Sequence, residues 1–205
     1  MSRTALITGA SRGLGLALAQ SLAAQGWRVV LVARHAEPLE RAVAQIRAQG
    51  GSAWGFAADL AQPDAAARIA GYAQAVAGPV DLLVNNASAL GPTPLRPMLD
   101  LRPEELDEVL QTNVVGPFRL TRAIAGAMAL RGQGTIVFVS SDAAVEAYPG
   151  WGAYGLSKAA ADHLTRTLAA AVASTTPPSP RASSSSGSVR SSSGNRVGSG
   201  GTQRS

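Results

Sequence analysis

Near its N-terminus the chain reads Thr4-Ala5-Leu6-Ile7-Thr8-Gly9-Ala10-Ser11-Arg12-Gly13-Leu14-Gly15. The first five residues form a short apolar run typical of a buried parallel strand, and a helical pattern extends as far as Gln25-Gly26. Gly9 permits a tight turn, and Gly13 and Gly15 let backbone approach a phosphate at the positive helix start. Such a turn can be purely structural, but its place between a strand and a helix predicts nucleotide binding.

The same alternation of strand and helix recurs along the chain. Strand patterns are predicted at 28–33, up to Ala58, at 81–84 and at 135–139, with helical patterns between them. Polar clusters follow two of these strands, Asp59-Leu60 and Asn85-Asn86-Ala87-Ser88. We therefore expect an α/β fold with a Rossmann-like, doubly wound parallel sheet between two helical layers, that is, a three-layer α/β/α domain.

The residues that follow the second predicted strand indicate whether the cofactor is NAD or NADP. In dinucleotide folds an acidic side chain there binds ribose hydroxyls, whereas basic residues accommodate a 2′-phosphate. Here the chain reads Ala33-Arg34-His35, and Arg34 together with Arg12 favours NADP over NAD because guanidinium groups suit phosphate oxygens. Two alternatives are that both arginines are simply solvated and that Glu37 supplies the acid, although we expect Glu37 in the first turn of the next helix.

A single long helix is predicted over roughly 103–130, after a proline-rich loop. Asn113 lies inside it, where asparagine has a mediocre helical propensity, just before Gly116-Pro117. The residue either satisfies a backbone carbonyl at a kink or has a catalytic role, and the pattern alone favours neither.

The chemistry is expected between Ser140 and Lys158. Ser141 follows the 135–139 strand, and Tyr154 and Lys158 lie four residues apart on one face of the next predicted helix. A phenol has an ordinary pKa of about 10, so a neighbouring cation is needed to stabilise the phenolate. A serine hydroxyl at the same point would hold a carbonyl or alcohol oxygen. A lone Tyr-x-x-x-Lys is also a common pair on helix surfaces.

Taken together, T-G-A-S-R-G-L-G, N-N-A-S, the helical Asn113, Ser141 and Y-G-L-S-K resemble the short-chain dehydrogenase/reductase family over residues 1–173. The resemblance implies an NADP-dependent oxidoreductase that moves a hydride between the nicotinamide and a small-molecule carbonyl or alcohol. Tyr154 would be the general acid or base, and Lys158 would bind the nicotinamide ribose and stabilise the phenolate. Ser141 would hold the reacting oxygen, and Asn113 would position a water in the proton relay.

The resemblance also implies the cofactor-binding set and a homo-oligomer formed through the two long helices. Ser88 departs from the glycine that is usual in the family. The implied cofactor-binding residues are Gly9, Ser11, Arg12, Gly13, Leu14, Gly15, Arg34, Asp59, Leu60, Asn86, Tyr154 and Lys158.

Composition excludes several other classes of function. The chain has 205 residues, no cysteine and two histidines, so a disulfide, a thiolate nucleophile and a metal site are not expected. Neither a signal peptide nor a membrane span is recognisable, and we expect a cytoplasmic protein. The net charge is +5, but four arginines lie in 174–205 without any acid; subtracting them leaves +1, so nucleic acid is not an expected partner.

The segment 174–205 is rich in serine, glycine and arginine and lacks the apolar pattern of a strand. We expect it to be a disordered tail, because such a composition buries too little apolar surface to offset its ordering entropy. The predicted domains are therefore 1–173, an incomplete nucleotide-binding domain, and 174–205. The strand at 135–139 would become a sheet edge. A truncated or frame-shifted reductase is one hypothesis, and a cofactor-binding protein without turnover and a tail-driven, anion-binding interaction module are alternatives.

Overall fold

A computed structural model of the chain describes residues 2–175. Within them, five strands form one parallel sheet in the order β3-β2-β1-β4-β5. The predicted doubly wound parallel sheet is confirmed. The strands are β1 (Thr4–Thr8), β2 (Arg28–Ala33), β3 (Ser52–Ala57), β4 (Leu82–Asn85) and β5 (Thr135–Phe138).

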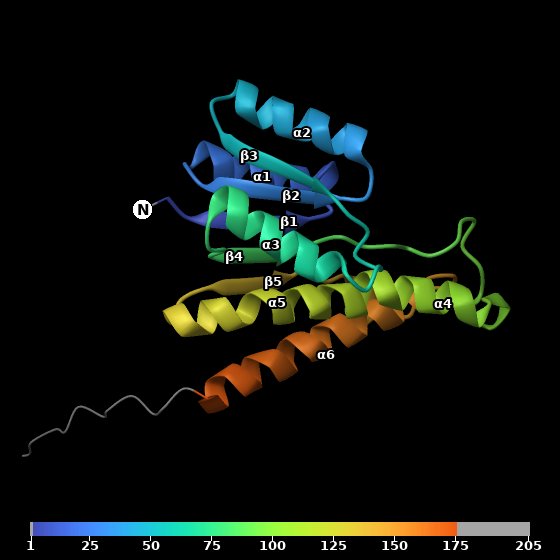
Figure 1. Ribbon diagram of the computed structural model, residues 1–205. Helices are drawn as coiled ribbons and strands as arrows, with labels where there is room; N and C mark the ends of the chain where they lie inside the picture. Colours follow the sequence, from blue (N-terminus) through green and yellow to red (C-terminus); the bar gives the residue numbers. More distant parts are fainter. Residues whose placement is uncertain (1, 176–205) are drawn as a thin grey trace, which may run out of the picture.

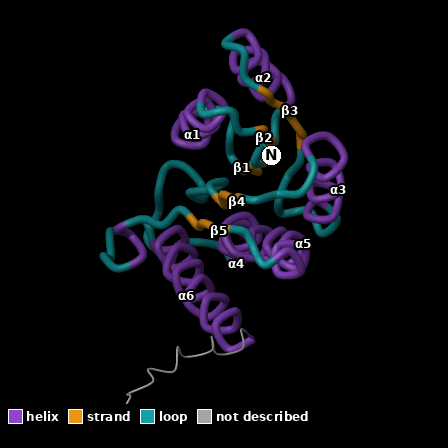
Figure 2. The backbone as a smooth tube through the Cα atoms, turned by 90° about the vertical axis from the view of Figure 1, so that its left-hand side faces the viewer, coloured by secondary structure: helices purple, strands orange, loops and turns teal. Residues whose placement is uncertain are grey.

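Helices cover both faces of this sheet (Figures 1 and 2). α1 and α2 lie on one face, α3 and α5 on the other, and α6 runs beyond β5. The helices are α1 (Gly13–Ala24), α2 (Ala36–Ala48), α3 (Ala65–Ala77), α4 (Pro103–Leu110), α5 (Gly116–Arg131) and α6 (Gly152–Thr175). The three-layer α/β/α arrangement is therefore the predicted one.

The central strands are buried on both faces, which explains why they read as continuous apolar runs. Successive side chains of a strand point to opposite faces. Ile7 and Leu31 pack in the cluster under α1 and α2, whereas Leu6 and Leu83 pack in the cluster under α3 and α5. α2 packs an apolar stripe of Leu39, Val43 and Ile46 in the first cluster, where Leu39 is 2% exposed.

The sheet order places the carboxyl ends of β1, β2 and β4 side by side. Thr8 pairs with Val32 of β2, and Ile7 pairs with Val84 of β4. The chain passes from β1 to β2 on one side and later returns to β4 on the other side. Such a reversal of strand order leaves a crevice above the strand ends, where open α/β sheets bind ligands.

The long helix expected over 103–130 contains a π-helical turn. α4 and α5 are joined by η2, a π-helical turn over Gln111–Val115, in which the Gly116 N–H donates to the Gln111 carbonyl. Pro117 explains the π turn, because it has no N–H to donate to the Asn113 carbonyl as a regular α-helix would require. The helical stretch itself extends without a break from Pro103 to Arg131, as predicted, and the π turn that contains Asn113 lies at the kink considered before Gly116-Pro117.

β5 forms an edge of the sheet as far as residues 2–175 extend, and Val137 on it is 40% exposed. This agrees with the expected edge strand. α6 runs to Thr175, two residues beyond the predicted domain boundary, and the expectation of disorder for 176–205 lies outside the described residues. Within 2–175, no helical segment combines the length and the hydropathy that a bilayer crossing requires.

Candidate functional site

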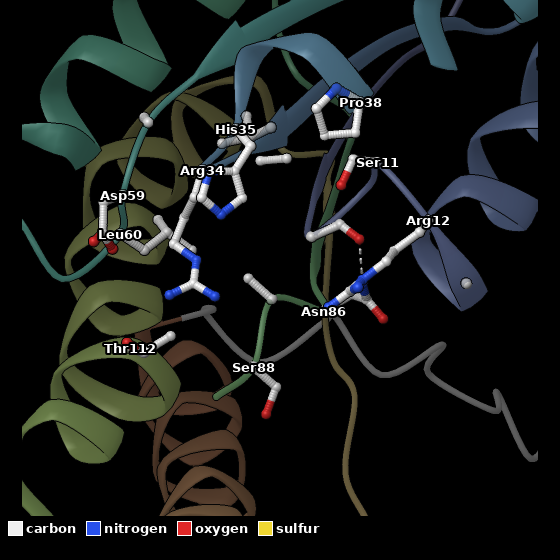
Figure 3. Close-up of a pocket in the computed structure, with 16 residues that line it drawn as sticks. Ser11, Arg12, Arg34, His35, Pro38, Asp59, Leu60, Asn86, Ser88 and Thr112 are labelled. Atoms are coloured by element: carbon white, nitrogen blue, oxygen red, sulfur yellow. Dashed lines mark hydrogen bonds between the residues drawn. The ribbon is translucent and has the colours of Figure 1, made fainter. Parts of the chain in front are cut away.

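A cleft of about 460 Å³ opens above the carboxyl ends of β1, β2 and β4 (Figure 3). It brings together eight of the predicted cofactor-binding residues. The residues in question are Gly9, Ser11, Arg12, Gly13, Arg34, Asp59, Leu60 and Asn86. The other four predicted residues, Leu14, Gly15, Tyr154 and Lys158, are not among the lining residues. The cleft is also lined by His35, Ser88 and Thr112, which no motif had singled out for binding.

Two glycines allow the turn after β1 to pack tightly. Gly9 has a φ of +65°, in the left-handed region, and a Cβ there would lie 2.8 Å from the Ala87 Cα. Gly15 is buried at the start of α1, where a Cβ would lie 2.5 Å from the Gly9 carbonyl oxygen. Gly15 therefore lets the helix pack directly beneath the turn rather than lining the cleft.

Thr8 and Asn86 hold this turn against the end of β4. The Asn86 Nδ2 donates to the carbonyls of Thr8 at 2.9 Å and Gly9 at 3.1 Å. The Thr8 Oγ1 accepts the backbone N–H groups of Asn86 and Ala87, each at 3.0 Å. The sequence had suggested Asn86 as a contact for the adenosine side, but it gave no role to Thr8. A buried threonine at a strand end before a glycine turn is the signal that was available.

The cationic side chains enter the cleft from different sides. Arg34 extends from the end of β2, and Arg12 lies on the side of the glycine turn (Figure 3). Asp59 is on the wall after β3, where its Oδ1 accepts the Ala61 N–H at 3.0 Å. Glu37 lies in the first turn of α2, as predicted, and forms an ion pair with Arg41. Glu37 is not one of the lining residues, so the cleft has one arginine from the end of β2, one from the glycine turn and no acid from α2.

Tyr154 and Lys158 lie one turn apart on α6, as predicted. The Lys158 Nζ is 5.5 Å from the centre of the Tyr154 ring and donates to the Val139 carbonyl at 2.8 Å. Lys158 is only 5% exposed, and burial lowers its pKa below the ordinary value, with Asp162 acting in the opposite direction. The phenol and the ammonium are therefore neighbours close to the carboxyl end of β5, which Val139 directly follows.

Ser141 lies at the start of η3, a 3₁₀ turn over Asp142–Ala144. Its Oγ donates to the Asp142 Oδ1 at 3.0 Å and accepts the Ala143 N–H at 3.2 Å. The η3 turn packs on the start of α6, since a Cβ on Gly155 would lie 2.6 Å from the Ala143 carbonyl oxygen. This packing brings the Ser141 segment to the end of α6 that contains Tyr154.

Three aromatic side chains line up beside Ser141. The ring centres of Tyr148 and Trp151 are 6.3 Å apart, and those of Trp151 and Tyr154 are 5.5 Å apart, both in edge-to-face geometry. The Tyr148 hydroxyl donates to the Asp142 Oδ2 at 3.1 Å. The bond from Ser141, followed by that from Tyr148, lowers the pKa of Asp142, and the bond to Asp142 raises the pKa of Tyr148.

Asn113 is buried in the π turn, and its side-chain amide makes three of the four hydrogen bonds open to it. Its Oδ1 accepts the Ala89 N–H at 2.7 Å, and its Nδ2 donates to the Ala89 carbonyl and to the Ser157 Oγ, both at 2.8 Å. The carbonyl that this side chain satisfies belongs to Ala89, outside the kink, so Asn113 ties the segment after β4 to α6. A catalytic role for Asn113 stays a prediction.

Known proteins resemble this chain along most of its length. A family model described as short chain dehydrogenase matches residues 3–176. A short chain dehydrogenase of Pseudocercospora fijiensis is 40% identical over 171 residues, which are 82% of this chain and 54% of that protein. The chain thus spans about half the length of this relative.

Solved structures agree in fold. A metagenomic short-chain oxidoreductase in complex with NADP is 37% identical with a TM-score of 0.79, over 84% of this chain and 77% of the other. An NAD+-bound xylitol dehydrogenase is 33% identical with a TM-score of 0.79, over 84% of this chain and 65% of the other. Similar structures therefore hold either nicotinamide dinucleotide.

Proposed function

The chain belongs to the short-chain dehydrogenase family, and on this premise we propose that it is an oxidoreductase that interconverts a small-molecule carbonyl and the corresponding alcohol with NADP(H). One observation supports this most directly: the Tyr154–Lys158 pair and the glycine-turn cleft both lie at the carboxyl ends of the same parallel sheet. When bound, the nicotinamide supplies or accepts the hydride.

The residues of the cleft fit a dinucleotide. Backbone at Gly9 and Gly13 leaves room for a pyrophosphate above the start of α1, where the helix dipole favours negative charge. Asp59 and Leu60 would contact the adenine side, and Asn86 keeps the turn in place. The cleft therefore suits a nucleotide with two phosphates and a flat base.

The preference for NADP over NAD rests on Arg34 and Arg12. A 2′-phosphate would add charge-assisted hydrogen bonds to guanidinium groups, and the acid that would instead bind free ribose hydroxyls is absent from the lining residues after β2. Glu37 is 84% exposed at its side chain and already paired with Arg41.

In the reaction, Tyr154 would give its phenolic proton to the oxygen during reduction and take one back during oxidation. Lys158 would hold the nicotinamide ribose, and its positive charge near the ring would stabilise the phenolate. Ser141 would hold the reacting oxygen. The Asn113 side chain is engaged in three hydrogen bonds, and Pro117 has no N–H to donate to the Asn113 backbone carbonyl, so that carbonyl would position a water in a proton relay.

Titration of the purified chain with NADPH and NADH, followed by nucleotide fluorescence, tests the proposal, together with turnover against a panel of carbonyl compounds. We expect NADPH to bind more tightly than NADH and at least one carbonyl to be reduced. Binding without any turnover would favour the alternative, a cofactor-binding protein that does not catalyse the reaction. A chain that binds neither nucleotide would contradict both.

A further inference from the structure

Asp142 accepts the hydroxyl proton of Ser141, and the proposed mechanism needs that proton to hold the reacting oxygen. A hydroxyl has one proton and two lone pairs. The Ser141 proton is directed to the Asp142 Oδ1 at 3.0 Å, and one of its lone pairs accepts the Ala143 N–H at 3.2 Å. Ser141 thus has only an acceptor lone pair left, whereas a carbonyl oxygen requires a donor.

The carboxylate of Asp142 is exposed and accepts from several donors. Its Oδ1 accepts from the Ser141 Oγ and the Ala143 N–H, and its Oδ2 accepts from the Tyr148 hydroxyl. Of these donors, the Ser141 hydroxyl is the one that the reacting oxygen also needs. A hydroxyl of a ligand beside Ser141 could therefore take its place on Oδ1.

From this geometry we propose that Asp142 is a specificity-determining residue that selects substrates with a hydrogen-bond donor on the carbon next to the reacting carbon. The substrate class is therefore α-hydroxyketones and the vicinal diols formed from them. The inference rests on the proposed function and names its substrate class.

A hydroxyl of the substrate would replace the Ser141 hydroxyl as the hydrogen-bond donor to Asp142. An α-hydroxyl that donates to Asp142 allows the Ser141 proton to turn toward the carbonyl oxygen. The spacing suits such an exchange, because oxygens on neighbouring carbons lie about one hydrogen-bond length apart, and the Ser141 Oγ and Asp142 Oδ1 are 3.0 Å apart. A plain ketone offers no donor, so the carboxylate loses the Ser141 hydroxyl and receives no hydrogen bond from the substrate in its place. A carboxylate beside the carbonyl would in addition be repelled by Asp142.

The test compares matched ketones with and without an α-hydroxyl: 3-hydroxybutan-2-one with butan-2-one, 2-hydroxycyclohexanone with cyclohexanone, and 2-hydroxyacetophenone with acetophenone. Each pair is measured as a ratio of kcat/KM within one preparation, which removes the effect of a partly unfolded sample. In the full-length wild type we expect the hydroxyketone to be preferred by about 10- to 100-fold, the range for a hydrogen bond to a charged group.

Asp142→Asn and Asp142→Ala should reduce that ratio toward one, mainly through the KM of the hydroxyketone. Glu146→Gln is the matched control, since it removes an exposed carboxylate four residues along the chain and should leave the ratio unchanged. Tryptophan fluorescence in the presence of NADP+ gives an independent reading, because Trp151 lies beside Tyr148: hydroxyketone affinity should fall in Asp142→Asn.

The outcomes separate the inference from the proposed function. If the wild type reduces both members of each pair with equal kcat/KM, or Asp142→Asn leaves the preference intact, the substrate class is wrong while the oxidoreductase proposal stands. If the wild type reduces no ketone of either kind, the proposed function fails and the inference fails with it.

Discussion

The Lys158 ammonium lies 5.5 Å from the centre of the Tyr154 ring, one turn away on α6, and is fixed there by a 2.8 Å bond to the Val139 carbonyl. The bond joins the helix to the strand end, so the cation cannot swing to solvent as surface lysines do. The pair is therefore preorganised before any ligand binds.

This relationship predicts how Tyr154→Phe behaves. Removal of the phenolic proton should lower kcat by about 10²- to 10⁴-fold, the usual contribution of general acid catalysis. NADPH affinity should stay close to that of the wild type, since the ring and its contact with Trp151 remain. Steady-state kinetics and nucleotide fluorescence measure the two effects. Tyr72→Phe is the control, because Tyr72 packs on Phe56 in a remote part of the fold; a wild-type kcat in Tyr154→Phe would remove Tyr154 from the mechanism.

Arg34→Ala should weaken NADPH binding by about 10- to 100-fold and leave NADH binding nearly unchanged, because only NADPH has the 2′-phosphate. Fluorescence titration with both nucleotides measures the difference. Arg41→Ala is the matched control, since Arg41 is paired with Glu37 on α2 and does not line the cleft. An equal loss of affinity for NADPH and NADH would mean that Arg34 does not bind the 2′-phosphate.

Asn113→Ala should lower the free energy of unfolding by about 2 to 4 kcal/mol, because it leaves the half-buried N–H and carbonyl of Ala89 without these partners. Urea unfolding measures the change. Gln111→Ala in the same π turn removes only an exposed side-chain bond to Asp107 and should cost much less. If the two variants prove equally stable, the bonds of Asn113 do not join the β4 segment to α6 as described.

The hydrogen bonds and ion pairs of Glu105 at the start of α4 should be sensitive to acid. The N–H of Arg102, followed by bonds from the side chains of Arg96 and Arg102, lowers the pKa of Glu105 from 4.5 to about 2. The folded pKa lies below the unfolded one, so this stabilisation is complete above the unfolded value and is lost as pH falls from about 4.5 to about 2.

Thermal unfolding between pH 2 and pH 6 tests this contact. Glu105→Gln should lower Tm at pH 6 and flatten the acid limb of the curve. Glu104→Gln, an exposed neighbour in the same helical turn, should follow the wild type. An acid limb that is unchanged in Glu105→Gln would show that the ion pair does not contribute.

The strands and helices could be predicted from local sequence patterns, because residues close together in the sequence determine where each of them forms. The run from Thr4 to Thr8 became β1, and the stripe of Leu39, Val43 and Ile46 became the buried face of α2. The π character of the turn was not predicted, because helical periodicity does not register that Pro117 has no N–H to donate to the Asn113 carbonyl. Thr8 was missed because its partners, Asn86 and Ala87, are nearly eighty residues away.

The sequence by itself determined the order of elements, the glycine turn and the helical spacing of Tyr154 and Lys158, since all of these depend on a few neighbouring residues. Only the tertiary structure decided that β1 lies between β2 and β4, which places Arg34, Asp59 and Asn86 around one cleft. It also decided that the Ser141 proton is held by Asp142, because the direction of a hydroxyl is set by the groups that surround it in space.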